Sequence, residues 1–245
     1  MTDPSTHLRL AGVTRLQIDG RGPRDAYVFD PHRLALPCWA LALEERAPPQ
    51  VATLLTFDRH LDLVAPREPA RIPDRSAGVL ALDAHTRLEL DVRNVDHIVA
   101  SMEAGLLGDA RVVAHTRPRG TLEGEGYRDT RGREHHWHVE PTLLQLLARG
   151  GIPPGGPVLL DIDLDAFTRP SALEPGELLP FSREEIRAYL LPKGSEAFWE
   201  SVLARTIALT LAREPYHCGG LVAAGRLFED AAHVIFEELL GADLP

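Results

Sequence analysis

Cysteine is scarce in this chain of 245 residues, which contains only Cys38 and Cys218, and the two do not form a CxxC pair. That scarcity excludes a disulfide-stabilised scaffold and predicts free thiols in a reducing compartment. The first residues lack a basic segment followed by an apolar run, as a secretory signal would have, and no apolar run approaches membrane-spanning length. We therefore expect a cytoplasmic protein with no membrane partner.

Basic residues are also too few to balance the acidic ones, with 26 Lys and Arg against 36 Asp and Glu and a formal net charge of −10. This balance argues against broad nucleic-acid binding, which needs a basic face to neutralise phosphates. An acidic protein instead attracts cations, either metal ions or a guanidinium-bearing substrate. The hydrophobic share of 44% is that of an ordinary globular protein.

Short, almost continuously apolar runs alternate with segments of helical periodicity. The expected strands are Asp25–Asp30, Val51–Asp58, Leu88–Val92, Ala110–His115, Pro157–Leu164 and Thr206–Leu211. The expected helices are Leu34–Arg46, Val95–Leu107, Thr142–Arg149, Arg183–Leu190, Glu196–Ala204 and a long one within Leu221–Leu240. Runs of this kind suit strands that are buried on both faces of a parallel sheet.

Strand–helix alternation predicts an α/β fold, a three-layer sandwich with a mainly parallel central sheet. Two segments interrupt the alternation, the proline-rich Pro66–Arg75 and the Arg- and Gly-rich Arg117–Arg133, and both are expected to be long surface loops. No internal repeat or linker divides the chain, so we expect a single domain over residues 1–245.

Acidic residues and a histidine follow two of the expected strands. Asp58, His60 and Asp62 follow the run VATLLTF, and Asp161, Asp163 and Asp165 follow PVLL. The carboxyl ends of parallel strands line the crevice in which ligands bind. Carboxylates that converge there repel one another unless cations compensate them, and carboxylates with imidazole suit manganese, iron or zinc. One DxD run at a strand end means little, but the two motifs together predict a metal site.

The two motifs resemble those of the ureohydrolase and deacetylase superfamily, which includes arginase and agmatinase. Arginases carry D-A-H-x-D after one strand, D-x-D after a later one, and a histidine upstream. The matches here are Asp58-Arg59-His60-Leu61-Asp62, Asp161-Ile162-Asp163 and His32. Within the superfamily, TFDRHLDL and LDIDLDAF are most similar to the uncharacterised protein family 0489 group, some of whose members are peptide arginases.

The resemblance implies an arginase-like fold and two manganese ions held by His32, Asp58, His60, Asp62, Asp161 and Asp163. Asp58 and Asp161 would bridge the ions, His32 and Asp62 would complete one site, and His60 and Asp163 the other. A water between two cations loses a proton near neutral pH and can attack a guanidinium carbon. Asp62 would be catalytic, holding this nucleophile and protonating the leaving amine. The products would be urea and ornithine, formed from arginine within a peptide.

Other positions depart from the arginase pattern. The N-x-H-G segment that grips a free amino acid is not reproduced, and its nearest match is Asn94-Val95-Asp96-His97. His97 is expected to be a catalytic proton shuttle or, alternatively, a polar residue that begins a helix. Glu214 is expected to bind substrate as a shifted counterpart of the guanidinium-binding glutamate, and Glu214 and His217 are both expected near the crevice.

Three further features of the sequence carry weaker expectations. Trp137 and His138, in the run His135-His136-Trp137-His138, are expected to bind substrate at the site entrance or, alternatively, to lie in a solvated loop. Asp165 is expected to orient a ligand from behind. The run Asp83-Ala84-His85 spells the arginase motif but lacks its third acid, so it is expected to be a surface turn or edge.

Two other functions stay open at this level. A deacetylase-type amide hydrolase would use a D-x-H pair, a distant aspartate and one zinc ion. A metal-stabilised module that binds peptides or proteins without catalysis is the other possibility. Neither the particular peptide or guanidine nor the oligomeric state follows from the sequence, although an assembly of identical chains is possible.

Overall fold

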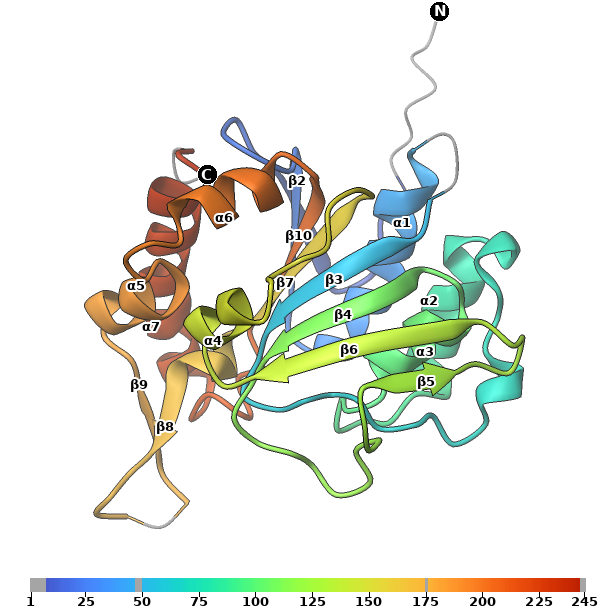
Figure 1. Cartoon of the computed structure of the whole chain (residues 1–245). Coiled ribbons are helices and arrows are strands. Elements are labelled where there is room, and N and C mark those ends of the chain that lie inside the picture. The colour runs from blue at the N-terminus through green and yellow to red at the C-terminus, as the bar shows by residue number, and fades with distance from the viewer. Residues whose placement is uncertain (1–7, 47–49, 175, 243–245) are drawn as a thin grey trace, which may run out of the picture.

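The computed structural model describes residues 8–46, 50–174 and 176–242. An eight-stranded sheet runs through the middle of the molecule in the order β1-β2-β10-β7-β3-β4-β6-β5, and a separate hairpin pairs β8 with β9 (Figure 1). The strands are β1 (Val13–Gln17), β2 (Asp25–Phe29), β3 (Ala52–Phe57), β4 (Leu107–Val113), β5 (Gly126–Arg128), β6 (Glu134–Glu140), β7 (Val158–Asp163), β8 (Thr168–Pro170), β9 (Leu178–Pro180) and β10 (Thr206–Ala212).

Helices cover both faces of this sheet. They are α1 (Ala35–Glu44), α2 (Val79–Leu88), α3 (His97–Glu103), α4 (Leu143–Ala148), α5 (Arg183–Leu190), α6 (Glu196–Leu203) and α7 (Leu221–Ala232), which continues as a π-helical segment over His233–Leu239. The six central strands, β2 to β6 in the sheet order, are parallel, and only the edge strands β1 and β5 are antiparallel to their neighbours. The expected α/β class with a mainly parallel sheet is confirmed.

The apolar runs of the central strands fill two separate cores. In β3, Leu54 packs into the cluster with α1, α2 and α3, whereas Leu55 packs into the cluster with α4, α5, α6 and α7. Successive side chains of a strand point to opposite faces, so a continuously apolar strand is buried on both sides. The layering α1–α3, sheet, α4–α7 follows from this pattern and is consistent with a three-layer sandwich.

Five of the six expected strands are present, and the prediction of a strand over Leu88–Val92 is wrong. Leu88 ends α2 and the next residues form turns, with Leu88 and Val92 both 78% exposed. Alternation of apolar and acidic residues in this run imitates a half-buried strand, but no neighbouring strand pairs with it. The sequence reasoning also missed β1, β5, β6 and the β8–β9 hairpin.

All six expected helices are present, although α3 ends at Glu103 because β4 begins at Leu107. Helix α2 was not expected, and it contains the Asp83-Ala84-His85 run, so the surface-turn interpretation of that run is wrong. Asp83 accepts a hydrogen bond from Arg87 one turn along the helix, at 2.9 Å. This run therefore lies on α2, and none of its residues belongs to a group that could hold a metal.

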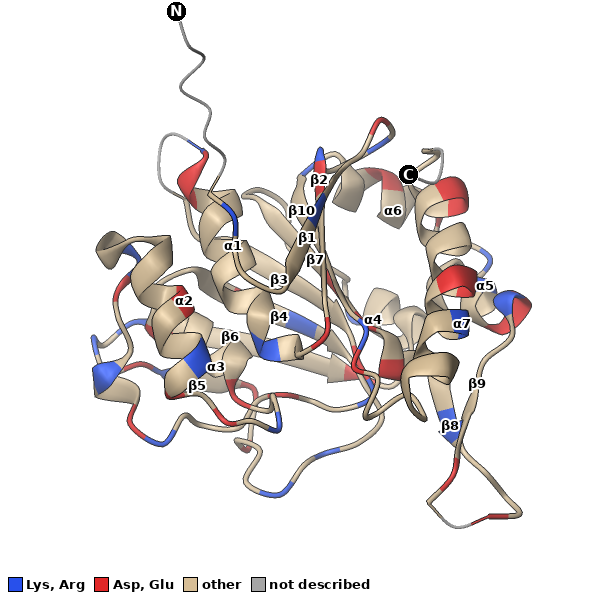
Figure 2. Ribbon diagram, turned by 180° about the vertical axis from the view of Figure 1, so that it is seen from behind, with Lys and Arg blue, Asp and Glu red and all other residues tan. Residues whose placement is uncertain are grey.

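The two expected loops contain short regular segments. Pro69–Arg71 forms a 3-10 turn within the first, and β5 lies within the second. Within the described ranges, no helix is long and apolar enough to cross a membrane. Figure 2 shows Lys and Arg interspersed with Asp and Glu over the helices and loops.

The chain reverses its direction across the sheet between β7 and β3. After β3 the parallel strands β4 and β6 follow toward one edge, and after β7 the strand β10 lies toward the other edge. Such a switch point opens a crevice beyond the carboxyl ends of its two strands. The D-x-H-x-D and D-x-D-x-D runs follow these two strands, so the fold brings them together at this crevice.

Candidate metal centre

His32 lies at the middle of the centre, in a 3-10 turn directly after β2. The side chain is fully buried, and its two ring nitrogens have different partners. Nε2 lies 2.8 Å from Asp161 Oδ2, whereas Nδ1 has no hydrogen-bond partner among the described residues. A buried polar nitrogen without a partner costs free energy, so a ligand for Nδ1 is to be expected.

Three carboxylate oxygens face this unpartnered nitrogen. Oδ2 of Asp62 and Oδ2 of Asp163 each lie 3.2 Å from His32 Nδ1, and Oδ2 of Asp58 lies at 3.4 Å. One ring proton can bond only one of them well, so most of this negative charge has no compensation from within the group. Carboxylate and imidazole atoms converging in this way fit a divalent cation.

Backbone amides fix the direction of two of these carboxylates. Asp58 Oδ1 accepts a hydrogen bond from the amide of His60 at 2.7 Å, and Asp163 Oδ1 accepts one from the amide of Asp165 at 3.0 Å. In both aspartates the amide two residues on holds one oxygen, as in an Asx turn, and leaves Oδ2 directed at His32. The D-x-H and D-x-D spacings therefore orient the side chains locally.

A second group of possible ligands shares Asp58 with the first. It consists of Asp58, His60 and Asp165. His60 Nδ1 lies 3.0 Å from Asp165 Oδ2 and 3.8 Å from Asp58 Oδ1. The His60 side chain is 29% exposed, whereas Asp58 and Asp165 are buried, so this group reaches solvent only through His60. Asp58 stands between the two groups, where a bridging ligand belongs.

The ionisation of the carboxyls also indicates a missing positive charge. Burial raises the pKa of Asp62 well above its ordinary value, and the nearby charge of Asp58 raises it further. Burial and the charge of Asp165 do the same to the pKa of Asp163. A cation among these acids would offset their desolvation and mutual repulsion. Among the described residues, three overlapping groups could hold a metal ion: His32, Asp62 and His97; His32, Asp58 and Asp163; and Asp58, His60 and Asp165.

Asp161 does not join the carboxylates that face His32 Nδ1, although the resemblance implied that it bridges two metals. Its Oδ2 lies next to His32 Nε2 and accepts a hydrogen bond from Thr56 at 2.7 Å, and its Oδ1 accepts one from Thr210 at 2.6 Å. The reason is its place within β7, between the neighbouring strands that carry the two threonines. The geometry gives Asp161 the role of orienting His32, and Asp165 replaces it among the possible ligands.

His97 is fully buried at the first residue of α3, so the alternative that it begins a helix is confirmed. Its ring centroid lies 4.3 Å from that of His32 and 5.6 Å from that of Trp39. Nδ1 lies 2.9 Å from the carbonyl oxygen of Asn94, to which it donates. Burial, and then the charge of His32, lower its pKa to about 3. A neutral, enclosed imidazole of this kind does not suit a shuttle that exchanges protons with solvent.

Glu214 fixes the backbone of the centre. Its Oε1 accepts hydrogen bonds from the amide of His32 at 2.7 Å and from the side chain of Asn94, and its Oε2 lies 3.5 Å from His217 Nε2. Among the described residues, the non-glycine positions with positive φ are Asp62, Asn94 and Glu214, and all three belong to this region. Strained backbone that persists in three separate loops around one histidine is typical of a functional site.

The expectation that Trp137 and His138 bind substrate at the entrance is wrong, and so is the alternative of a solvated loop. Both residues belong to β6, two strands away from β3. Trp137 is 1% exposed in the core beside α1 and α3 and donates to the carbonyl oxygen of Gly124 at 2.9 Å. His138 is paired with Arg111, and no group that could hold a metal includes it.

Sequence reasoning missed Tyr189, which comes from α5. Its hydroxyl has no hydrogen-bond partner among the described residues. Burial raises its pKa, and the charges of Asp58 and Asp165 raise it further, so the hydroxyl lies near these two carboxylates. No local motif surrounds Tyr189 in the sequence, so only the packing of α5 against the end of β3 reveals it, through a Phe57–Tyr189 ring contact at 6.1 Å.

A cavity of about 800 Å³ lies elsewhere, between the start of β2, the end of α1 and Ile207 at the start of β10. It is at the amino edge of the sheet and is lined by none of the clustered ligands, so it is separate from the candidate metal centre. No protein-family model matches this chain, and no curated protein matches it. Membership of the ureohydrolase and deacetylase superfamily therefore stays a prediction from the motifs.

Proposed function

We propose that this chain is a metal-dependent hydrolase that holds two divalent cations and cleaves a guanidinium C–N bond. The observation that carries the proposal is the convergence of three aspartate Oδ2 atoms on the unpartnered Nδ1 of His32, next to a second group that shares Asp58. Two adjoining groups favour two cations over the single ion of a deacetylase-type enzyme. Neighbouring pairs of metal ions are a common device for hydrolysis.

The ligands divide between the two groups around Asp58. His32, Asp62 and Asp163 would hold one cation together with Asp58, and His60 and Asp165 would hold the other. This assignment keeps the expected D-x-H-x-D ligands. In the second motif, the ligands become Asp163 and Asp165 instead of Asp161 and Asp163. Because carboxylates outnumber imidazoles and no thiolate is present in either group, manganese suits the site better than zinc.

In the proposed reaction, water adds to the guanidinium carbon and the C–N bond to the amine breaks. Two bound cations would lower the pKa of a water enough to make it nucleophilic at neutral pH. Asp62 accepts a proton from the attacking water and passes it to the departing nitrogen, so arginine yields urea and ornithine. Asp62 must be ionised to accept this proton, and the two cations would favour its ionised form by offsetting the effect of burial.

The substrate would approach from the exposed side of the His60 group. The ring centroids of His60 and His217 lie 5.7 Å apart, and those of His217 and Tyr216 lie 5.5 Å apart. Tyr216 is 92% exposed, so the three rings lead from solvent to the carboxylates. A planar cation can stack on such rings, and Glu214 Oε2 can accept its N–H groups. The missing free-amino-acid clamp favours arginine within a peptide.

Incubation of the manganese-loaded chain with peptides that each contain one arginine tests this proposal. We expect urea in solution and ornithine in the peptide by mass spectrometry, with no change in peptides that carry lysine instead. Free arginine, agmatine and acetyl-lysine peptides are the comparison substrates. Release of acetate without urea would establish the deacetylase-type alternative. Failure of every guanidine, with metal content verified, would contradict the proposal and favour a non-catalytic binding module.

A further inference from the structure

Two adjoining cavities lie at the amino edge of the sheet, at the opposite ends of the strands from the metal centre. The first has a volume of about 800 Å³ and the second about 410 Å³, and both are lined by Arg24, Arg46 and Ile207. Ile207 is the second residue of β10, whereas Glu214 of the metal centre follows the other end of the same strand. The cavities are therefore separate from the proposed hydrolytic site.

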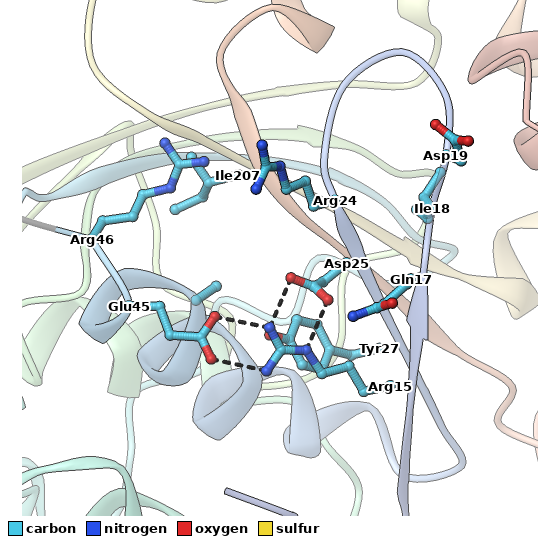
Figure 3. Close-up of a pocket in the computed structure, with 11 residues that line it drawn as sticks. Arg15, Gln17, Ile18, Asp19, Arg24, Asp25, Tyr27, Glu45, Arg46 and Ile207 are labelled. Atoms are coloured by element: carbon cyan, nitrogen blue, oxygen red, sulfur yellow. Dashed lines mark hydrogen bonds and ion pairs between the residues drawn. The ribbon is translucent and has the colours of Figure 1, made fainter. Parts of the chain in front are cut away.

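The charged residues of the larger cavity are an ion-pair cluster, two arginines and Asp19. Arg15 donates two hydrogen bonds to Asp25 at 2.8 Å and two to Glu45 at 2.9 Å, and its guanidinium lies 5.6 Å from the ring centroid of Tyr27. Figure 3 shows this ion-pair cluster on one side of the cavity and the guanidinium groups of Arg24 and Arg46 on the other. The carboxylates of Asp25 and Glu45 are thus already occupied by Arg15.

Arg24 and Arg46 are solvent-exposed, and their side chains have no hydrogen bond or ion pair with any part of the chain that the structure describes. Arg205 joins them in lining the smaller cavity. Its Nη1 donates to the carbonyl oxygens of Pro153 at 2.9 Å and of Gly155 at 2.8 Å, which fixes the side chain without neutralising its charge. The smaller cavity therefore has three arginines and no acidic residue in its lining.

We propose that this arginine corner, formed by Arg24, Arg46 and Arg205, binds a small phosphate-bearing anion. Arginine guanidinium groups present planar pairs of donors that match phosphate oxygens. In a chain with a formal net charge of −10, unpaired arginines that share a cavity run against the overall charge. A site for a divalent anion accounts for their placement, because such a ligand would neutralise two guanidinium groups at once.

Calorimetric titration of the metal-loaded full chain with inorganic phosphate tests this inference. Sodium chloride at matched ionic strength controls for screening, and sulfate serves as a divalent anion that coordinates metal weakly. The variant R24Q/R46Q removes the two unpaired arginines. The matched control R119Q/R226Q makes the same charge change at exposed arginines outside both cavities. A phosphomonoester forms a further arm that distinguishes free phosphate from an organic phosphate.

We expect saturable binding of phosphate and sulfate by the wild-type chain and by R119Q/R226Q, with affinity lower by about tenfold or more in R24Q/R46Q. Phenylglyoxal should modify Arg24 and Arg46 more slowly when phosphate is present, as read by peptide mass spectrometry. Equal affinity of R24Q/R46Q and R119Q/R226Q would overturn the inference, as would binding no tighter than that of chloride. Tighter binding of the phosphomonoester than of phosphate would identify an organic phosphate as the ligand.

Discussion

Asp161 Oδ2 lies 2.8 Å from Nε2 of His32, while Nδ1 of the same ring faces Asp58, Asp62 and Asp163. A carboxylate on one ring nitrogen fixes the orientation and tautomer of a histidine whose other nitrogen binds metal. Trp39 extends this arrangement by donating to Thr210 at 3.0 Å, and Thr210 donates to Asp161. The buried network ties the centre to α1 and β10.

We expect D161N to weaken manganese binding by about 10- to 100-fold while leaving two cations per chain at saturation. The amide can no longer attract the proton on His32 Nε2 as a carboxylate does, so the imidazole becomes a poorer donor. Competition with a chelating dye measures the affinity. D83N, on the surface of α2, is the control for a changed aspartate. An affinity for D161N equal to that of D83N would remove the orienting role.

The position of the second motif relative to the metals can be decided by stoichiometry. We expect D165A to bind one cation per chain instead of two, because Asp165 and His60 would hold the second cation together with Asp58. D161N serves as the comparison within the same motif and should still bind two. Elemental analysis after gel filtration gives the ratio. Two cations in D165A and one in D161N would restore Asp161 as a ligand and displace Asp165.

The exposed ring of Tyr216 is expected to serve substrate capture. Removal of the ring in Y216A should raise KM for an arginine peptide by roughly 2- to 30-fold with little change in kcat, because stacking on a cation contributes a modest free energy. Steady-state kinetics and metal content are measured together, and Y216F is the control that keeps the ring. A fall in kcat with unchanged KM would show that Tyr216 acts in the chemical step instead.

Asp129 provides a pH-dependent contribution to stability away from the centre. Burial works to raise its pKa, but hydrogen bonds from the backbone and side chain of Arg133 and from His135 outweigh burial and lower the pKa to about 2. A folded-state pKa below the unfolded value of about 3.9 means that the ionised carboxylate stabilises the fold at higher pH. That stabilisation is complete above the unfolded pKa and disappears as pH falls through about 2.

We therefore expect D129N to lower the free energy of unfolding at pH 7 by about 1–3 kcal/mol. The difference from wild type should shrink between about pH 4 and pH 2, since protonation then removes the same charge from wild type. Urea denaturation at several pH values measures it, with D19N in an exposed loop as the control. A difference that grows on acidification would contradict the sign of the pKa shift.

Much of the fold followed from the sequence, because strands buried on both faces carry uninterrupted apolar runs, as in β3, β7 and β10. Strand β6 was not predicted because its buried positions include His135, a polar residue that interrupts the apolar pattern of a strand. The sequence locates the site but does not determine which aspartates of the second motif are ligands. Spacing of two residues fits both Asp161 with Asp163 and Asp163 with Asp165, and only the end of β7 at Asp163 decides between them.

The sequence alone did not predict the contacts between distant segments. Glu214 was expected to approach a guanidinium, yet one of its oxygens holds the amide of His32, which lies far from it along the chain. The sequence predicts His97 to be either a proton shuttle or the first residue of a helix, and its enclosure by His32 and Trp39 appears only when α1 and α3 pack together. Local patterns predict residue types at strand ends, and packing determines which atoms remain free.

A crystal structure of the manganese-soaked chain, with anomalous scattering at the manganese edge, tests the central claim most directly. We predict two anomalous peaks that share Asp58, one beside His32 Nδ1, Asp62 and Asp163 and the other beside His60 and Asp165. A single peak would reduce the centre to one cation. No peak at His32, or manganese coordinated by Asp161 in place of Asp165, would contradict the ligand assignment on which the proposed chemistry rests.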